Sequence, residues 1–148
     1  MLDQQHNVML HSLSARGVEL SDRYRDLAGL EGLPQAMAEE LRELACEREG
    51  LMAEFRQEVL SEGGMPKAGN PDREFIDSLT DRWLSRLQGL DAVFSRLQQA
   101  EQAWLDDIGL LSREEWSEPL AELLISLSFH GHRCQERLQW MADHSQRR

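Results

Sequence analysis

The sequence has few of the residues that build disulfide scaffolds, nucleic-acid surfaces or membrane spans. Two cysteines, Cys46 and Cys134, are too few for a disulfide framework, and we expect both to pack as small hydrophobic residues. Lys and Arg total 16 against 27 Asp and Glu, and the net charge of -11 disfavours phosphate binding. No apolar run approaches the roughly 20 residues that span a bilayer. We therefore expect neither a nucleic-acid nor a membrane partner.

The sequence also has little that would form a β-sheet or direct export. β-Branched residues are scarce, and no segment alternates between apolar and polar residues for long. The first ten residues are polar and lack the apolar core of a signal peptide, which favours a cytoplasmic location in a bacterium. The 148 residues are 41% hydrophobic, which is typical of one folded domain. The prediction is a single all-α domain over residues 1–148.

Apolar residues recur at helical spacing in five segments. The predicted helices span about 7–28, 34–61, 71–88, 91–108 and 113–143. Gly63 and Gly64 should end the second helix, and Asn70 should cap the third. The spacing from Ser112 to Glu115 is that of a capping box, which predicts that the last helix starts there. Four long helices, with a shorter one in the long central connection, predict an antiparallel four-helix bundle of two helical hairpins.

Two charged residues interrupt apolar stripes. Arg48 lies in the middle of the stripe of the second helix, and Glu101 lies in the middle of the stripe of the 91–108 helix. A lone buried charge costs several kcal/mol, so each residue needs a partner. Because both residues lie near the middle of their helices, we predict a buried or half-buried ion pair between Arg48 and Glu101.

The two predicted hairpins resemble each other at an offset of about 80 residues. Under this internal repeat, Glu101 corresponds to Ser21 and Arg48 corresponds to Gly131. Each hairpin therefore has a small residue where the other has a charged one. We expect Gly131 to leave room for the Arg48 side chain across the bundle axis.

A complete di-iron site is not expected. Such a site takes a Glu from each of two helices and a Glu-x-x-His from each of the other two, and no Glu-x-x-His occurs in this sequence. We therefore expect no cofactor. The alternative is a single Fe, Mn or Zn ion held by Glu101 with donors drawn from Glu47, His130, His132 and Cys134. Apart from that alternative, we expect His130 at the core boundary and His132 on the surface.

The layout and several short motifs resemble bacterial ferritin-like bundles of unknown function, whose architecture is similar to rubrerythrin and bacterioferritin. The motifs are the Glu62-Gly63-Gly64-Met65-Pro66-Lys67 loop, Trp83, and Glu101-Gln102-Ala103-Trp104. The resemblance covers about residues 9–143. It implies a ferritin-like fold with Glu101 at a ligand position. The Glu that such bundles carry in their first helix falls at Ser21 here, so the di-iron motif is incomplete.

These observations predict a non-catalytic protein with a binding, structural or stress-associated role. We expect a homodimer, or binding to another protein, because Leu10, Val18, Met52 and Leu105 lie outside the main stripes and an interface would cover them. One alternative is a divergent metal-binding protein or oxidoreductase with its site near Glu101 and His130. The other alternative is an acidic helical secretion-type chaperone, which predicts an exposed apolar helix surface.

Overall fold

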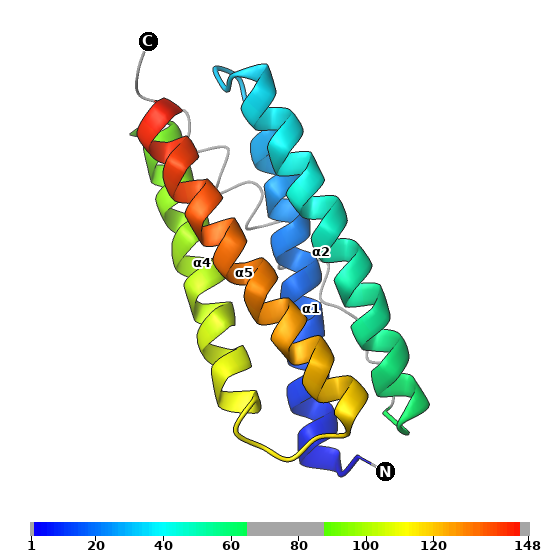
Figure 1. The fold of residues 1–148 in the computed structure, drawn as a ribbon. Helices are drawn as coiled ribbons and strands as arrows, with labels where there is room; N and C mark the ends of the chain where they lie inside the picture. Colours follow the sequence, from blue (N-terminus) through cyan, green and yellow to red (C-terminus); the bar gives the residue numbers. More distant parts are fainter. Residues whose placement is uncertain (1, 65–87, 146–148) are drawn as a thin grey trace.

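A computed structural model describes residues 2–64 and 88–145. Within these ranges the chain is all-helical, as predicted, with four long helices and no strand. The helices are α1 (Gln4–Ala28), α2 (Gln35–Ser61), α4 (Leu90–Leu111) and α5 (Glu118–Ser145), shown in Figure 1. The shorter helix predicted over 71–88 lies, except for its last residue, outside the described ranges. None of the described helices is both long enough and apolar enough to cross a membrane.

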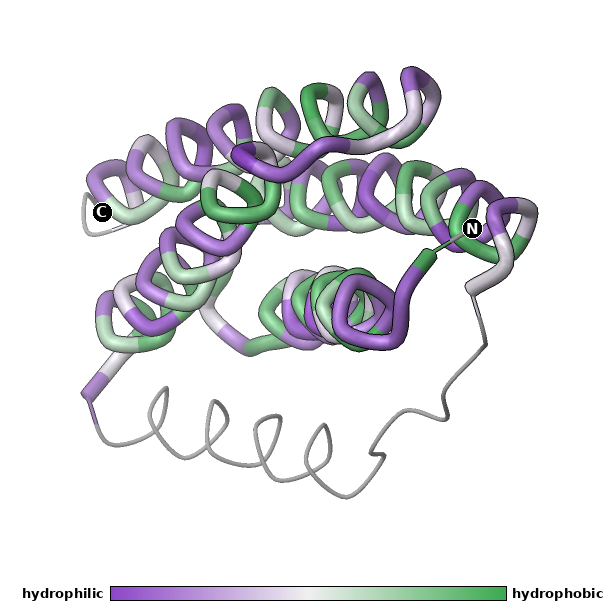
Figure 2. Tube along the Cα trace, turned by 90° about the horizontal axis from the view of Figure 1, so that it is seen from below, coloured by the Kyte–Doolittle hydropathy of each residue, from purple (hydrophilic) through white to green (hydrophobic). Residues whose placement is uncertain are grey.

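The four helices form one bundle. α1 packs against α2 and α4 packs against α5, and these two pairs meet where α2 packs against α5 and α1 against α4. The order around the bundle is therefore α1, α2, α5, α4, which places α2 and α4 on a diagonal. Figure 2 shows hydrophobic and hydrophilic residues alternating along each helix, as expected when one face of each helix is buried.

The core is drawn from all four helices. Fully buried side chains include Tyr24, Phe55, Phe94 and Leu138, one from each helix. Burying a large apolar side chain stabilises the fold by roughly 1.5–3 kcal/mol. The only polar atom of the Trp104 side chain is also paired, because its Nε1–H donates to the Leu13 carbonyl at 2.9 Å and so joins α4 to α1.

The core also includes residues that the sequence analysis assigned to an interface. Leu10, Met52 and Leu105 are buried in the bundle, and Val18 is half-buried against it. Their use as an argument for a dimer was wrong. The apolar stripes of three helices were interpreted as narrower than they are, since a helix with two neighbours buries a wide face.

The start of α5 differs from the prediction. The capping-box interpretation of Ser112 is wrong, because the Ser112 hydroxyl donates at 2.7 Å to a carbonyl oxygen in the last turn of α4. The cap is Ser117 instead, whose hydroxyl oxygen accepts from the Leu120 N–H at 3.3 Å. Pro119 then lies in the first turn of α5, where a missing N–H costs no helical hydrogen bond.

The other helix ends are close to the predicted ones. α1 starts at Gln4, earlier than predicted, because the Asp3 side chain accepts from the His6 N–H at 2.7 Å and caps the helix. α2 ends at the predicted glycines. Gly63 has φ of 95°, and the Gly64 N–H donates to the Val59 carbonyl at 2.8 Å, which is the pattern of a Schellman cap.

Candidate functional site

A polar cluster lies inside the bundle and takes residues from all four helices. Its members are Tyr24 of α1, Arg48 of α2, Glu101 of α4, and His130 and Cys134 of α5. All five are buried, and Arg48 and Glu101 are 0% exposed. We call these five residues the core cluster. Polar groups buried to this degree need hydrogen-bond partners, so the contacts within the cluster decide its chemistry.

An ion pair forms the centre of the core cluster. Arg48 Nη2 lies 2.7 Å from Glu101 Oε1. The Tyr24 hydroxyl donates to the same carboxylate oxygen. Burial, and then the Glu101 carboxylate, raise the pKa of Tyr24 well above its ordinary value. The phenol therefore stays protonated and donates to Glu101.

Aromatic rings surround the Arg48 guanidinium. Its central carbon lies 4.1 Å from the centroid of the Trp104 ring and 5.8 Å from that of Tyr24. Attraction between a cation and an aromatic face is strongest where water is excluded, as it is here. Arg48 Nη2 also lies 3.6 Å from the Cys134 sulfur. The guanidinium thus contacts side chains from all three of the other helices, α1, α4 and α5.

His130 is held from both sides by α2. Arg48 Nε donates to His130 Nδ1 at 3.0 Å. Arginine has no acceptor, so Nδ1 must present its lone pair and the neutral ring must carry its hydrogen on Nε2. Nε2 lies 3.2 Å from Glu47 Oε2, which accepts that hydrogen. Burial, and then the Arg48 charge, lower the pKa of His130 from 6.5 to about 4, so the ring is neutral at pH 7.

The two cysteines lie in different environments. Cys134 is buried, and burial raises the pKa of its thiol to about 11, which leaves almost no thiolate at neutral pH. Cys46 is exposed, with its sulfur 3.2 Å from Arg25 Nη2, so the expectation that it packs as a small hydrophobic residue was wrong. It lies on the outward side of α2 beside α1.

The core cluster does not fit a metal ion. Glu101 Oε1 is taken by Arg48 and Tyr24, and both ring nitrogens of His130 face partners on α2. Glu101 Oε2 and Arg48 Nη1 have no hydrogen-bond partner among the described residues, but the Arg48 guanidinium already places a positive charge against this carboxylate through Nη2. Across residues 2–64 and 88–145, no three His, Cys, Asp or Glu side chains are grouped to hold a metal.

Of the remaining predicted metal ligands, Glu47 lies beside His130, whereas His132 is separated from the core cluster. Glu47 is half-exposed at the edge of the core cluster, and His132 lies on the exposed side of α5. Gly131 does not make room for Arg48 as expected. A Cβ atom there would collide with the Leu105 side chain, so the glycine lets α4 approach α5.

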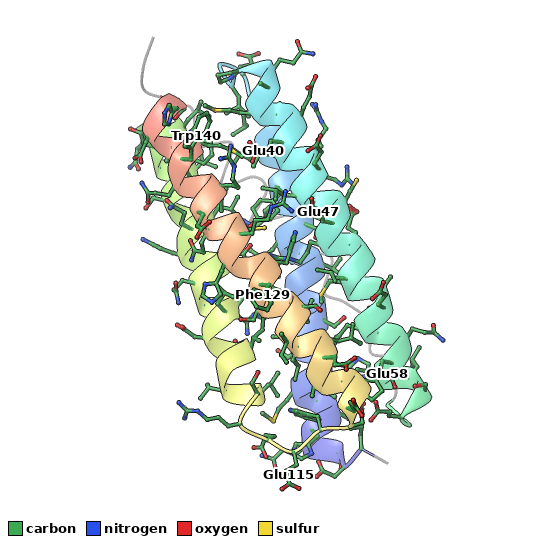
Figure 3. All side chains as sticks on the ribbon, viewed as in Figure 1. Glu40, Glu47, Glu58, Glu115, Phe129 and Trp140 are labelled. Carbon is green, nitrogen blue, oxygen red and sulfur yellow. The ribbon has the colours of Figure 1, made fainter. Side chains whose placement is uncertain are left out.

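An ionic seam continues from the core cluster along α2 and α5. Glu47 Oε2 lies 2.5 Å from Arg133 Nη1, and Glu40 Oε1 accepts from Arg137 Nη2 at 2.7 Å. Figure 3 shows Glu40 and Glu47 on α2, and their partners lie on α5. Glu47 of the seam contacts His130 of the core cluster, so the surface is linked to the Arg48–Glu101 pair through His130.

Sequence reasoning missed Tyr24 as a member of the core cluster. It treated the residue as one more apolar position of the first helix. The available signal was that Tyr24 is the only tyrosine of the chain and lies in the middle of an apolar stripe, where its hydroxyl must find a partner.

The outward face of α5 carries large apolar side chains. Phe129 is 72% exposed, and Ile125, one turn earlier, is 57% exposed. Figure 3 labels Phe129 near the middle of α5. A third residue, Trp140, is partly covered, since it stacks on His144 and lies under the guanidinium of Arg137. Ile125 and Phe129 therefore form the open part of this surface, which we call the α5 face.

No family model, curated protein or solved structure matches the chain.

Proposed function

We propose that this chain is a non-catalytic, ferritin-like helical bundle that acts by binding protein through the α5 face, and that its partner is a second copy of itself. The observation that carries the proposal is the exposure of Phe129 and Ile125, at 72% and 57%, in the middle of a helix. A contiguous apolar patch on a surface helix is typical of a protein-binding site. Aromatic residues in particular are enriched where interfaces are buried.

The closed state of the core cluster supports a non-catalytic role. Its central pair, Arg48 and Glu101, has no exposed surface through which a substrate could enter. The thiol of Cys134 is buried and protonated, and His130 has both ring nitrogens occupied. The cluster is arranged to hold four helices in one register, a use of buried polar groups that is known from other helical assemblies.

The course of the chain supports the ferritin-like arrangement. In Figure 1 the colours of α1 and α5 advance from the lower end of the bundle to the upper end, and those of α2 and α4 advance in the opposite direction. These helix directions are those of two antiparallel hairpins joined by one long connection. The long connection distinguishes ferritin-like bundles from simple up-and-down bundles. The connection between α2 and α4 runs from residue 62 to residue 89.

Charges on α5 favour a second copy as the partner. Exposed Glu118 and Glu122 lie in the first half of the helix, and Arg133 and Arg137 lie in the second half. Phe129 is near the middle. If two copies pair through α5 in opposite directions, Glu118 and Glu122 of each copy approach Arg133 and Arg137 of the other, which also pair with Glu47 and Glu40 of their own copy, and the two Phe129 rings lie near the twofold axis. A dimer interface of this kind uses the same patch on both copies.

Sedimentation equilibrium tests the proposal. We expect the wild-type protein to be a dimer and the double variant Ile125→Ser/Phe129→Ser to be a folded monomer. Leu110→Ser is the matched control, because Leu110 is 55% exposed on a different helix and should leave the dimer intact. A wild-type protein that stays monomeric at every concentration, or a double variant that still dimerises, would contradict the proposal.

A second candidate is the acidic helical secretion-type chaperone, which the same exposed face favours. In that case Phe129 binds a hydrophobic segment of an exported protein, and the α5 face is covered only in that complex. The two proposals make different predictions for the purified protein. If the protein is a chaperone, one partner should co-purify with it in defined stoichiometry. The Phe129→Ser variant should lose that partner, whereas the Leu110→Ser variant should retain it.

A further inference from the structure

We infer that His130 is an acid-sensitive latch between α2 and α5, which holds the two helices together only while its ring is neutral. The inference rests on how the ring is placed. It projects from α5 and makes hydrogen bonds to two consecutive residues of α2, Glu47 and Arg48, one from each nitrogen. Because the two bonds require opposite roles, as acceptor from Arg48 and donor to Glu47, only one tautomer of the neutral ring satisfies both.

Protonation removes the first of these bonds. A proton added at Nδ1 would point at the Arg48 Nε–H, which lies 3.0 Å away and cannot turn into an acceptor. It would also place a second positive charge against the buried guanidinium. The Arg48 side chain cannot move away easily, because Glu101, Trp104 and Cys134 hold it from the far side. The ring must therefore leave its position when it gains a proton.

The groups around His130 do not compensate for that charge. On α2 it faces Glu47 and Arg48, and on its own helix Arg133 and Cys134 are nearby. Among residues 2–64 and 88–145, Glu47 is the only anion in direct contact with the ring, and it is half-exposed and already paired with Arg133. The Glu101 carboxylate of α4 is occupied by Arg48 and by the Tyr24 hydroxyl of α1. Glu47 raises the pKa of His130, but burial and the Arg48 charge together lower it by more.

The direction of the pH effect follows from the lowered pKa in the folded state. The unfolded chain takes up the His130 proton near pH 6.5, whereas the folded chain resists it until about pH 4. Between these values the unfolded state binds more protons, so the free energy of unfolding falls as the pH falls. The contribution of the neutral ring is complete above pH 6.5 and is lost as the pH approaches 4.

Two measurements test the latch. The first is nuclear magnetic resonance of the ring nitrogens in the wild-type protein. We expect the Nε2–H tautomer at pH 7 and a titration midpoint near pH 4. A ring that titrates near pH 6.5, or that carries its hydrogen on Nδ1, would overturn the inference. This measurement needs no variant, so it decides the question even if a substitution at His130 prevents folding.

The second measurement is urea unfolding at pH 7 and at pH 4.5 for the wild type, His130→Gln and His132→Gln. A glutamine at position 130 does not titrate, while His132 is an exposed residue of the same helix and serves as the control. Carboxylates weaken all three proteins in acid, so the difference between proteins is the readout. The unfolding constant of the wild type and of His132→Gln should rise on the order of 50-fold more than that of His130→Gln. Equal rises in all three would contradict the latch.

Discussion

Arg48 and Glu101 form an ion pair across the diagonal of the bundle, with Nη2 and Oε1 2.7 Å apart. Their helices, α2 and α4, belong to different hairpins and do not pack side by side. These two long side chains can meet at the centre only when their helices have one relative position along the bundle axis. The pair therefore fixes the register of the two hairpins, and Tyr24 and His130 extend the same constraint to α1 and α5.

Removing one partner of this pair should be much worse than removing both. Arg48→Met leaves the Glu101 carboxylate buried without its cation, and a change of this kind costs about 3–5 kcal/mol. Arg48→Met/Glu101→Leu removes the uncompensated charge and should recover most of that loss. Urea unfolding of the two single variants and the double variant gives the coupling energy. If the losses of the single variants simply add, the two charges are not acting as a buried pair.

The position of this pair could be predicted from the sequence, but its surroundings could not. Arg48 and Glu101 each interrupt a stripe of apolar residues near mid-helix, and the cost of burying a charge then limits the choice of partner. The contact of Arg48 with His130 depends on how α2 and α5 are rotated about their axes, which no local pattern determines. The sequence therefore predicts His130 at the core boundary and does not predict its contact with Arg48.

Local signals also competed at the start of α5. Ser112 and Ser117 both resemble caps, and the spacing from Ser112 to Glu115 favoured the first. Pro119 decides between them, because proline is tolerated in the first turn of a helix and not in its interior. With Ser117 as the cap, Pro119 falls in that first turn. The interpretation of Gly131 failed for the same reason as that of His130, since its neighbour Leu105 is set by tertiary packing.

Gly131→Ala should destabilise the protein although alanine is the better helix former. The added methyl group collides with the Leu105 side chain at the contact between α4 and α5, and overpacking of this kind costs about 1–3 kcal/mol. Gly109→Ala is the control, because nothing lies within 4 Å of its added Cβ. It should stabilise the protein by roughly 0.5–1 kcal/mol. Thermal unfolding followed by circular dichroism gives both values, and a stabilising Gly131→Ala would contradict the close packing described here.

The protein purified without a histidine tag should carry no stoichiometric Fe, Mn or Zn. Glu101 Oε1, His130 Nδ1 and the Cys134 sulfur are each paired with Arg48, so a guanidinium lies among the atoms that would bind a metal. Elemental analysis of the wild type and of Glu101→Ala checks this. The substitution should lower the melting temperature without changing the metal content, because it leaves Arg48 as an unpaired buried cation. Stoichiometric metal that is lost in Glu101→Ala would instead support the divergent oxidoreductase.

Tyr24 should remain protonated in alkali for as long as the protein stays folded. Burial and the Glu101 carboxylate raise the pKa of its phenol well above the ordinary value. The folded state therefore holds this proton more tightly than the unfolded state does, and stability falls as the pH rises past the pKa of the unfolded phenol. Because Tyr24 is the only tyrosine, the ultraviolet absorbance of tyrosinate reports on it alone. That absorbance should rise together with the loss of helical circular dichroism. Tyrosinate that forms near pH 10 while the helices are intact would show that the hydroxyl is not enclosed beside Glu101.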